Sequence, residues 1–275
     1  MTLSALLSDL VDRLSGAGVE SARLDAECII RHVCSFPRHV FIADPFREIA
    51  ASDAAICLAL SARRENKEPI AYILQEKEFY GLSFYVDRRV LIPRPDTELL
   101  VETALSLLPK GGCLLDICTG SGAVAAAVAY ERPDCSVTAS DISEDALAVA
   151  TLNGERLVPD RITFVRSDLF AAFAGEQFDC ITANPPYVSS ELEGTLQPEL
   201  SFEPGLALYA KDKGLVIIEE IIKQFPTFLK DGGALAMEIG FDQGDAVRAM
   251  ALAAGAECSV MKDLSGNDRT AVLRI

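Results

Sequence analysis

The chain has 275 residues, of which 50% are hydrophobic, and its formal net charge at pH 7 is −16. This length and composition suit a globular protein with one large hydrophobic core and a smaller second one. The strong acidity disfavours a protein that grips DNA or RNA, because such proteins need a basic surface, although net charge does not rule out a local basic groove.

No targeting or membrane-spanning segment is evident. The longest apolar runs, such as Ala123–Ala129 and Leu215–Ile218, fall well short of the roughly 20 residues that a membrane span needs. The N-terminus has no basic start, and Asp9 and Asp12 interrupt its apolar pattern, unlike a secretion signal. We therefore expect a cytoplasmic protein with no membrane contact.

The first part of the chain is predicted to be helical. Apolar residues recur at helical spacing in Leu3–Leu14 and Ala26–Val33, and a further helix starts near Asp53, a plausible cap, and runs toward Asn66. These patterns predict a small helical domain.

A short linker follows the helices. Phe79–Val86 has the pattern of a β-hairpin or paired strands, and Ile92–Pro95 breaks any regular element. We therefore divide the chain into a helical domain at 1–75, a hairpin linker at 76–93 and a second domain at 94–275.

From Asp96 onward, predicted strands and helices alternate, which implies a parallel, doubly wound sheet. The strands are Cys113–Ile117, Ser136–Ser140, Ile162–Arg166, Phe178–Ala183, Ala234–Ile239, Glu257–Lys262 and Thr270–Ile275, and the helices lie near 97–108, 122–131, 143–153, 214–229 and 243–253. Only Asp263–Arg269 separates the last two strands. This is too short for a helical crossover, so these strands should pair antiparallel.

A glycine-rich turn follows the first strand of the alternating region and precedes an alanine-rich helix. The turn consists of Cys118, Thr119, Gly120, Ser121 and Gly122. Such a turn lets the backbone approach a ligand closely and exposes N–H groups at the helix start, at the edge where open α/β sheets bind nucleotides. We predict a cofactor site here, with a structural tight turn as the alternative.

Polar residues also follow the next two strands. Asp141 lies about 20 residues after Gly122, where a carboxylate can accept the protons of ribose hydroxyls. Asp168 and Leu169 follow the third strand and are candidates to hold the edge and face of adenine. A dinucleotide fingerprint needs glycine where this chain has Cys118, so we favour an adenosyl cofactor without a pyrophosphate over NAD.

The fourth strand ends in Asn184, Pro185, Pro186 and Tyr187. The prolines have no N–H donor, so the chain beyond the strand is rich in acceptors. A planar NH2 group has two diverging donors, for which Asn184 Oδ1 and the Pro185 carbonyl are candidate acceptors, with Tyr187 stacking on the flat group. Asn-Pro-Pro is also an ordinary exit from a strand, and amide and nucleobase amines fit this pattern equally well.

The chain has eight cysteines and two histidines. The cysteines are scattered, with no C-x-x-C pair, and several lie in apolar runs, so we expect reduced core residues. His32 and His39 flank Cys34 without the ligand spacing of a metal site, and they lie far from the motifs above. We predict no metal and no histidine-based catalysis.

Together these residues resemble S-adenosylmethionine-dependent methyltransferases, and specifically the release factor glutamine methyltransferase family. The similarity covers essentially the whole chain. Besides Asn184–Tyr187, the matching segments are Pro69–Ile73, Phe79–Leu82, Ile92–Glu98, Phe202–Pro204 with Ala207 and Leu208, and Leu264–Arg269. The resemblance implies an α/β fold with a Rossmann-like, seven-stranded class I methyltransferase sheet, an antiparallel terminal hairpin and a small N-terminal helical domain that recognises the substrate.

The activity that this resemblance implies is methyl transfer from S-adenosylmethionine, with S-adenosylhomocysteine as product, to the side-chain amide nitrogen (N5) of glutamine in the Gly-Gly-Gln motif of peptide-chain release factors, which supports translation termination. Residues 118–122 and Asp141 match its cofactor positions, and Leu169 falls where the family contacts adenine. Asn184–Tyr187 match the substrate-amide site, and we count Asn184 with the cofactor residues as well.

Three positions and two other functions stay open. Cys118 stands where many relatives of the wider fold have glycine, while Arg94 and Glu98 either orient the cofactor or the hairpin or are plain salt-bridge partners. The main alternative function is an adenine-N6 or cytosine-N4 nucleic-acid methyltransferase, which the acidic charge disfavours because base-flipping enzymes need a groove-binding surface. A non-catalytic binding module is the third interpretation. The intact cofactor and amide motifs oppose it, and measurable binding of S-adenosylmethionine would discriminate against it.

Overall fold

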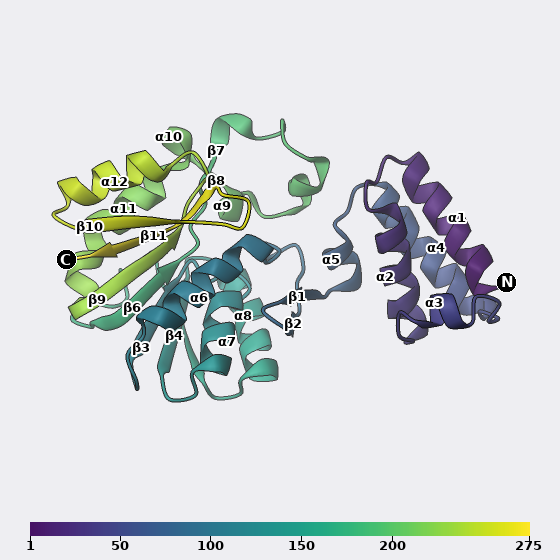
Figure 1. The fold of residues 1–275 in the computed structure, drawn as a ribbon, viewed down its shortest axis with the longest axis horizontal. Coiled ribbons are helices and arrows are strands. Elements are labelled where there is room, and N and C mark those ends of the chain that lie inside the picture. Colours follow the sequence, from purple (N-terminus) through teal and green to yellow (C-terminus); the bar gives the residue numbers. More distant parts are fainter. The chain divides into compact units, whose positions relative to one another are not determined.

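The computed structural model describes residues 1–275, which divide into two compact units. The helical unit comprises Met1–Gln75 with Pro198–Phe202, and the sheet unit comprises Glu76–Gln197 and Glu203–Ile275. Figure 1 labels the elements of both units along the chain. None of the helices combines the length and apolar character that crossing a membrane requires.

The helical unit contains five helices around its own core. They are α1 (Leu3–Gly16), α2 (Ala22–Cys34), α3 (Val40–Ala43), α4 (Ala51–Glu65) and α5 (Ile70–Leu74). The periodic leucines of α1 are buried, from Leu3 to Leu14, which confirms the helix predicted there. Asp53 is not the cap of α4 as predicted, because the helix begins at Ala51 and places this carboxylate in its first turn, where the helix dipole favours negative charge.

A two-stranded hairpin opens the sheet unit, as predicted. Strands β1 (Lys77–Phe79) and β2 (Leu82–Phe84) pair antiparallel. Tyr80 and Gly81 between them both have positive φ, at 50° and 71°, which is the backbone of the tight turn that matches strand twist.

The central sheet has seven strands in the order β10-β11-β9-β6-β3-β4-β5. The strands are β3 (Cys113–Ile117), β4 (Ser136–Asp141), β5 (Ile162–Arg166), β6 (Phe178–Ala183), β9 (Leu229–Glu238), β10 (Glu257–Lys262) and β11 (Asp268–Arg274). β3, β4, β5, β6 and β9 run parallel, whereas β11 pairs antiparallel with both β9 and β10. This confirms the predicted parallel sheet with an antiparallel terminal hairpin.

Five longer helices accompany the sheet: α6 (Glu98–Leu107), α7 (Ala123–Glu131), α8 (Glu144–Leu157), α11 (Val216–Gln224) and α12 (Gly244–Ala253). The first three pack in sequence against one another, as Figure 1 shows, and α11 packs against α12. Leu115 and Ile117 of β3 share one apolar core with side chains of α11 and α12. The neighbouring residues of β3 point the other way, as alternation along a strand requires.

Shorter elements connect β6 to β9. They are β7 (Val188–Ser189), β8 (Tyr209–Ala210), α9 (Gly205–Leu208), α10 (Lys211–Gly214) and the 3-10 turns η2 (Ser190–Leu192), η3 (Pro198–Phe202) and η4 (Phe225–Phe228); a further turn, η1 (Pro95–Thr97), precedes α6. The helix predicted over 214–229 ends at Gln224, since Pro226 follows within the next turn and lacks an N–H for continued α-helix.

Candidate functional site

A cavity opens in the sheet unit where the parallel strands end. Among the predicted residues it is lined by Cys118, Thr119, Gly120, Ser121, Asp141, Asp168, Leu169, Asn184 and Pro186. The sheet thus brings together the ends of β3, β4, β5 and β6, the edge at which open α/β sheets bind ligands. Gly122, Pro185 and Tyr187 are not among the residues that line the cavity, so the contacts predicted for them stay predictions.

The glycine-rich turn after β3 has an unusual backbone. Cys118, Gly120 and Gly122 all have positive φ, at 57°, 56° and 79°. A side chain on Gly122 would approach the Ala150 backbone of α8 within 3.2 Å, so glycine is needed there for close helix packing. Cys118 adopts the left-handed conformation despite its side chain, at a cost of about 1–3 kcal/mol, and the turn therefore keeps its shape without a glycine at this position.

Asp116 anchors this turn from inside the sheet, and the sequence interpretation missed it. Its Oδ2 accepts from the Thr119 hydroxyl at 2.6 Å, and its Oδ1 accepts from the Thr182 hydroxyl at 2.7 Å on the neighbouring strand β6. Burial raises the pKa of Asp116 to about 6, while the two hydroxyl groups oppose that rise. A carboxylate in the middle of an apolar strand is itself a signal of function.

Asp141 lies at the end of β4 and faces the same cavity. Its Oδ2 accepts from the backbone N–H of Gly120 at 2.9 Å, and its Oδ1 accepts from that of Ser143 at 3.0 Å. Burial raises the pKa of Asp141, and these backbone N–H groups act against that rise. Because a carboxylate has about four acceptor sites, both oxygens keep capacity for further donors.

The segment after β5 forms another part of the wall. Asp168 and Leu169 line the cavity, and Leu169 has a positive φ of 46°. The Ser167 hydroxyl donates to the Leu169 carbonyl at 2.8 Å, which fixes this strained turn. Ile142, the residue after Asp141, also lines the cavity, and it is an apolar contact that the predicted site left out.

The polar segment after β6 is held firmly in place. Asn184 Nδ2 donates to the hydroxyl of Thr97 at 3.3 Å, and the Tyr187 hydroxyl donates to Glu238 Oε1 at 3.0 Å. Gln243 Nε2 donates to the Tyr187 carbonyl at 3.0 Å. The phenol of Tyr187 is thus directed to a buried carboxylate, and stacking of its ring on a substrate stays a prediction.

Two family-like segments that are distant in sequence meet beside the cavity. The guanidinium of Arg94 pairs with Glu203 Oε1 at 2.5 Å, and the backbone N–H of Ile92 donates to Glu203 Oε2 at 3.1 Å. Glu98 instead accepts from the backbone N–H of Tyr80 at 3.0 Å. Arg94 therefore joins the cavity wall to the segment after Phe202, and Glu98 ties the hairpin turn to α6.

All eight cysteines are unpaired. Cys57, Cys135 and Cys180 are buried, as expected for core residues, and the other five are partly exposed. Burial raises the pKa of Cys57 and of Cys180 to about 12. A thiol with such a raised pKa is a poor nucleophile, so these cysteines fit a packing role.

Two protein families match the chain, one in the helical unit and one in the sheet unit. Residues 5–74 match the family described as "PrmC N-terminal domain", and residues 95–197 match "Methyltransferase small domain". In fold, the chain is similar to a methyltransferase of Pyrococcus furiosus, with a TM-score of 0.55 over 72% of this chain and 90% of that one at 20% identity.

Curated relatives match nearly the full length. The chain is 40% identical over 257 residues to the release factor glutamine methyltransferase of Escherichia coli K12, covering 93% of both chains. It is 36% identical over 274 residues to that of Caulobacter vibrioides, covering 98% of this chain and 95% of the relative. With this similarity across both units and a cavity at the methyltransferase edge of the sheet, the chain belongs to the release factor glutamine methyltransferase family.

Proposed function

We propose that this protein transfers a methyl group from S-adenosylmethionine to the side-chain amide nitrogen of the glutamine in the Gly-Gly-Gln motif of peptide-chain release factors. The observation that carries the proposal is the position of Asn184, which lines the same cavity as the Gly120 turn and Asp141. An acceptor for a planar NH2 group and a wall suited to an adenosyl cofactor thus share one space. The close relatives supply the identity of the substrate.

The charge of the cavity suits a cationic cofactor. Asp116, Asp141 and Asp168 all line it. Asp116 and Asp141 accept hydrogen bonds from uncharged hydroxyl and N–H donors and form no ion pair, whereas the two arginines of the wall are neutralised by Asp87 and Glu203. A sulfonium is favoured in such surroundings and a pyrophosphate is disfavoured, which supports S-adenosylmethionine over a dinucleotide.

Named residues have complementary groups for each part of that cofactor. The free lone pairs of Asp141 suit the ribose hydroxyls, and the apolar side chains of Ile142 and Leu169 suit an adenine ring. The backbone of the turn at residues 118–122 suits the amino-acid portion, because glycines permit close approach. When bound, the cofactor supplies an electrophilic methyl group on its sulfonium.

The substrate nitrogen must be held in strict alignment, because its lone pair is delocalised into the amide carbonyl and it is a poor nucleophile. We propose that Asn184 Oδ1 and the Pro185 carbonyl accept its two N–H groups. This would aim the nitrogen and stabilise the positive charge that develops on it. No resident general base is needed, because the methylated nitrogen is acidic and its proton can leave late to one of these acceptors or to water.

Methyl transfer to three candidate substrates tests the proposal. The protein is incubated with S-adenosylmethionine labelled in the methyl group and with a release factor, its Gly-Gly-Ala variant, or DNA. Label on the intact release factor alone is the expected result. Label on the variant or on DNA would overturn the substrate assignment and favour, respectively, another protein site or a nucleobase amine.

A variant separates the substrate site from the cofactor site. Asn184→Ala removes one of the two proposed acceptors, and loss of a charge-stabilising group of this kind costs about 100- to 1,000-fold in kcat. The affinity for S-adenosylmethionine, measured by calorimetry, is expected to change little. Turnover at the wild-type rate would refute the role of Asn184, and loss of cofactor binding would move it to the cofactor site.

The helical unit and the cellular compartment follow from the same proposal. Residues 5–74 match a family domain of their own, and we assign to this unit the recognition of the release factor. Because release factors act on ribosomes, we place the protein in the cytoplasm. Deletion of residues 1–75 should raise KM for a release factor while the sheet unit still binds S-adenosylmethionine, and an unchanged KM would contradict this role.

A further inference from the structure

The backbone of the amide segment, residues 184–187, has few groups by which the protein can hold it. Pro185 and Pro186 have no N–H, so the first backbone donor after Asn184 belongs to Tyr187. The role proposed above also requires that the Pro185 carbonyl stays free for the substrate. The segment must therefore be held from beyond the prolines, and Tyr187 is the first place where this is possible.

A buried carboxamide holds the backbone of Tyr187. Gln243 is 4% exposed, and its Nε2 donates to the Tyr187 carbonyl at 3.0 Å and to the Lys213 carbonyl at 3.0 Å. Its Oε1 accepts from the backbone N–H of Gly240 at 2.8 Å. Both N–H groups of the amide are thus in use, and turning the carboxamide over would place its oxygen against two carbonyl oxygens. These three bonds therefore fix Gln243 in a single orientation.

The second carbonyl that Gln243 binds lies in a strained stretch of backbone. Asp212, Lys213 and Gly214 are three consecutive residues with positive φ, at 51°, 54° and 82°, a conformation that residues with side chains disfavour. Such a stretch persists only where surrounding contacts hold it, and it is typical of functional sites. The bond from Gln243 to the Lys213 carbonyl is one of those contacts.

This strained stretch packs directly against the backbone of Tyr187. A side chain at position 214 would collide with the Tyr187 carbonyl group, and its Cβ would lie 2.9 Å from Gln243 Nε2. Strand β7, which follows Tyr187, pairs in parallel with β8, which precedes the strained stretch. The Tyr187 carbonyl therefore contacts both the side chain of Gln243 and the backbone at Gly214.

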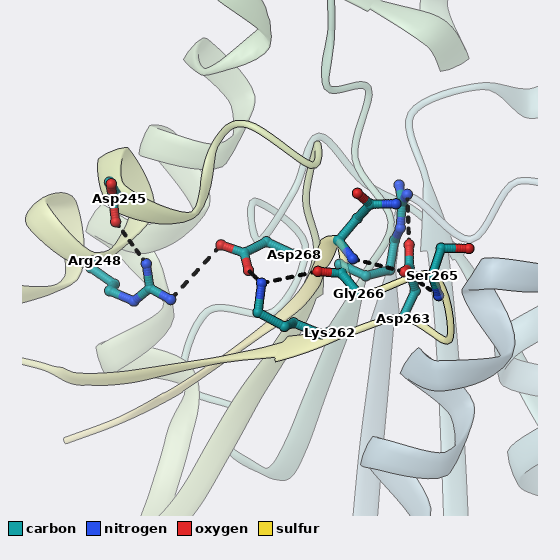
Figure 2. Close-up of polar contacts among 9 residues, drawn as sticks. Asp245, Arg248, Lys262, Asp263, Ser265, Gly266 and Asp268 are labelled. Atoms are coloured by element: carbon teal, nitrogen blue, oxygen red, sulfur yellow. Dashed lines mark hydrogen bonds and ion pairs between the residues drawn. The ribbon is translucent and has the colours of Figure 1, made fainter.

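The helix that follows Gln243 is itself tied to the terminal hairpin. Gln243 directly precedes α12. Figure 2 shows that Arg248 of this helix bonds Asp245 at 2.8 Å and lies 3.8 Å from Asp268 of the hairpin. Lys262 pairs with the same carboxylate of Asp268 at 3.0 Å. Gln243 thus stands at the start of an anchored helix and not in a loose loop.

We propose that Gln243 is a positioning residue for the methyl transfer: it holds the Tyr187 carbonyl and thereby fixes the Pro185 carbonyl and the Asn184 side chain at the cavity. This inference rests on the proposed function. The ring of each proline locks its φ, and the residue before a proline is restricted as well. A shift at Tyr187 is therefore poorly absorbed by rotation at the prolines and passes on to Asn184.

The contacts of Gln243 belong to the substrate side of the site. Gln243 and Tyr187 are not among the residues that line the cavity, whereas Asn184 and Pro186 are. The side-chain bonds of Gln243 lead to the amide segment, the strained stretch and the turn after β9, and not to the cofactor turn at residues 118–122. A change at Gln243 should therefore slow methyl transfer and leave the binding of S-adenosylmethionine unchanged.

Kinetics of two variants test the proposal. Gln243→Glu keeps the shape of the side chain but has no N–H group, and Gln243→Met keeps its length and fills the space without either hydrogen-bonding group. Both are expected to lower kcat on the release factor by about 10- to 100-fold, the size of effect that misplaced reacting groups produce. Affinity for S-adenosylmethionine, measured by calorimetry, should stay within about twofold.

Gln177→Glu separates positioning from stability. Gln177 precedes the same strand β6 at the end opposite to Asn184, and its Nε2 donates to the Leu229 carbonyl at 3.0 Å. Loss of this bond should lower stability without changing kcat. Each rate is measured below the temperature at which that variant unfolds, so that loss of folded protein is not read as slow turnover. A wild-type kcat in Gln243→Met, or an equal loss of kcat in Gln177→Glu, would overturn the proposal.

Hydrogen exchange distinguishes failure of this inference from failure of the proposed function. The backbone amides of residues 187–189 should exchange faster in both Gln243 variants than in the wild type, and at the wild-type rate in Gln177→Glu. If the wild-type protein does not methylate a release factor, the proposed function fails, and the exchange rates still decide whether Gln243 holds this segment. Unchanged exchange in both Gln243 variants would refute that role whatever the substrate.

Discussion

Replacing Asp116 with asparagine should change how the stability of the protein depends on pH. Burial raises the pKa of Asp116 from an ordinary 3.8 to about 6. Between these values the folded protein binds a proton that the unfolded chain has released, so the free energy of unfolding falls as pH rises. A difference of about two pH units corresponds to about 3 kcal/mol in total.

About half of this effect, ~1.5 kcal/mol, falls between about pH 5 and pH 8, a range that stays above the pI near 4.6. Urea unfolding at the two pH values measures it. The unfolding free energy of Asp116→Asn minus that of the wild type should increase by this amount toward pH 8. The asparagine also disturbs the bonds to Thr119 and Thr182, but that loss shifts both measurements equally.

Asp179→Asn is the matched control within the same unit. Asp179 accepts from Lys230 and from the Cys113 backbone, and these interactions lower its pKa despite the opposing effect of burial. The stabilising contribution of Asp179 is lost only as pH falls below the ordinary pKa of an aspartate. The unfolding free energy of Asp179→Asn minus that of the wild type should therefore stay nearly constant between about pH 5 and pH 8. A flat difference for Asp116→Asn as well would refute the reasoning that this carboxylate is a costly buried charge.

Substitutions at three further positions test the geometry of the site and of the segments around it. Gly214→Ala should lower the unfolding free energy by about 3 kcal/mol or more, measured by thermal unfolding, because the new Cβ would collide with the Tyr187 carbonyl oxygen. Cys118→Gly should keep turnover and cofactor affinity, since glycine adopts its φ of 57° freely, whereas Cys118→Val should be destabilised by about 1–3 kcal/mol. Glu203→Gln should weaken the affinity for S-adenosylmethionine, measured by calorimetry, by about 3- to 10-fold, because it disrupts the ion pair with Arg94 in the cavity wall.

The substitutions of Gly214 and Glu203 each have a control on the same chain. Gly232 has a similar φ of 77°, and a Cβ added there would have no other atom within 4 Å, so Gly232→Ala isolates backbone strain from collision. Glu219→Gln breaks an exposed ion pair with Lys223 on α11 and should leave cofactor affinity unchanged. Equal destabilisation of the two glycine variants, or equal affinity of the two glutamine variants and the wild type, would contradict the reasoning.

Buried parallel strands were the easiest elements to predict. The buried central strands β3 and β6 have the predicted ends, because strands buried in such a sheet read as short apolar runs bounded by polar or glycine residues. The edge strands β5 and β10, which are more exposed, also have the predicted ends. The start of β9 was predicted five residues too late, since Lys230, Asp231 and two glycines precede its apolar part. Lys230 forms an ion pair with Asp179 on β6. A contact with the neighbouring strand thus supports the start of β9, where the local sequence has no apolar run that predicts a strand.

That these polar and glycine residues line one cavity was predictable, but the contacts that support the cavity were not. Glycines and carboxylates that directly follow successive strands can be expected to lie close together, because the ends of parallel strands meet at one edge of the sheet. By contrast, Arg94 pairs with Glu203, 109 residues further along the chain, and the Tyr187 hydroxyl donates to Glu238, which lies 51 residues further along. No periodicity or spacing indicates such contacts, which depend on the folded arrangement.

Some violations of local rules line the cavity at this edge of the sheet, and their place there is an argument for function. Ser35 and Gln75 also have positive φ, but they end helices, where the left-handed conformation is common. Cys118 and Leu169 adopt it in turns that line the cavity, where no helix end explains the strain. Two buried carboxylates near this edge are a second kind of cost: Asp116 lines the cavity, and Glu238 accepts from the hydroxyl of Tyr187. Because natural sequences otherwise agree with their fold at every level, costs gathered at one place mark the residues that the chemistry requires.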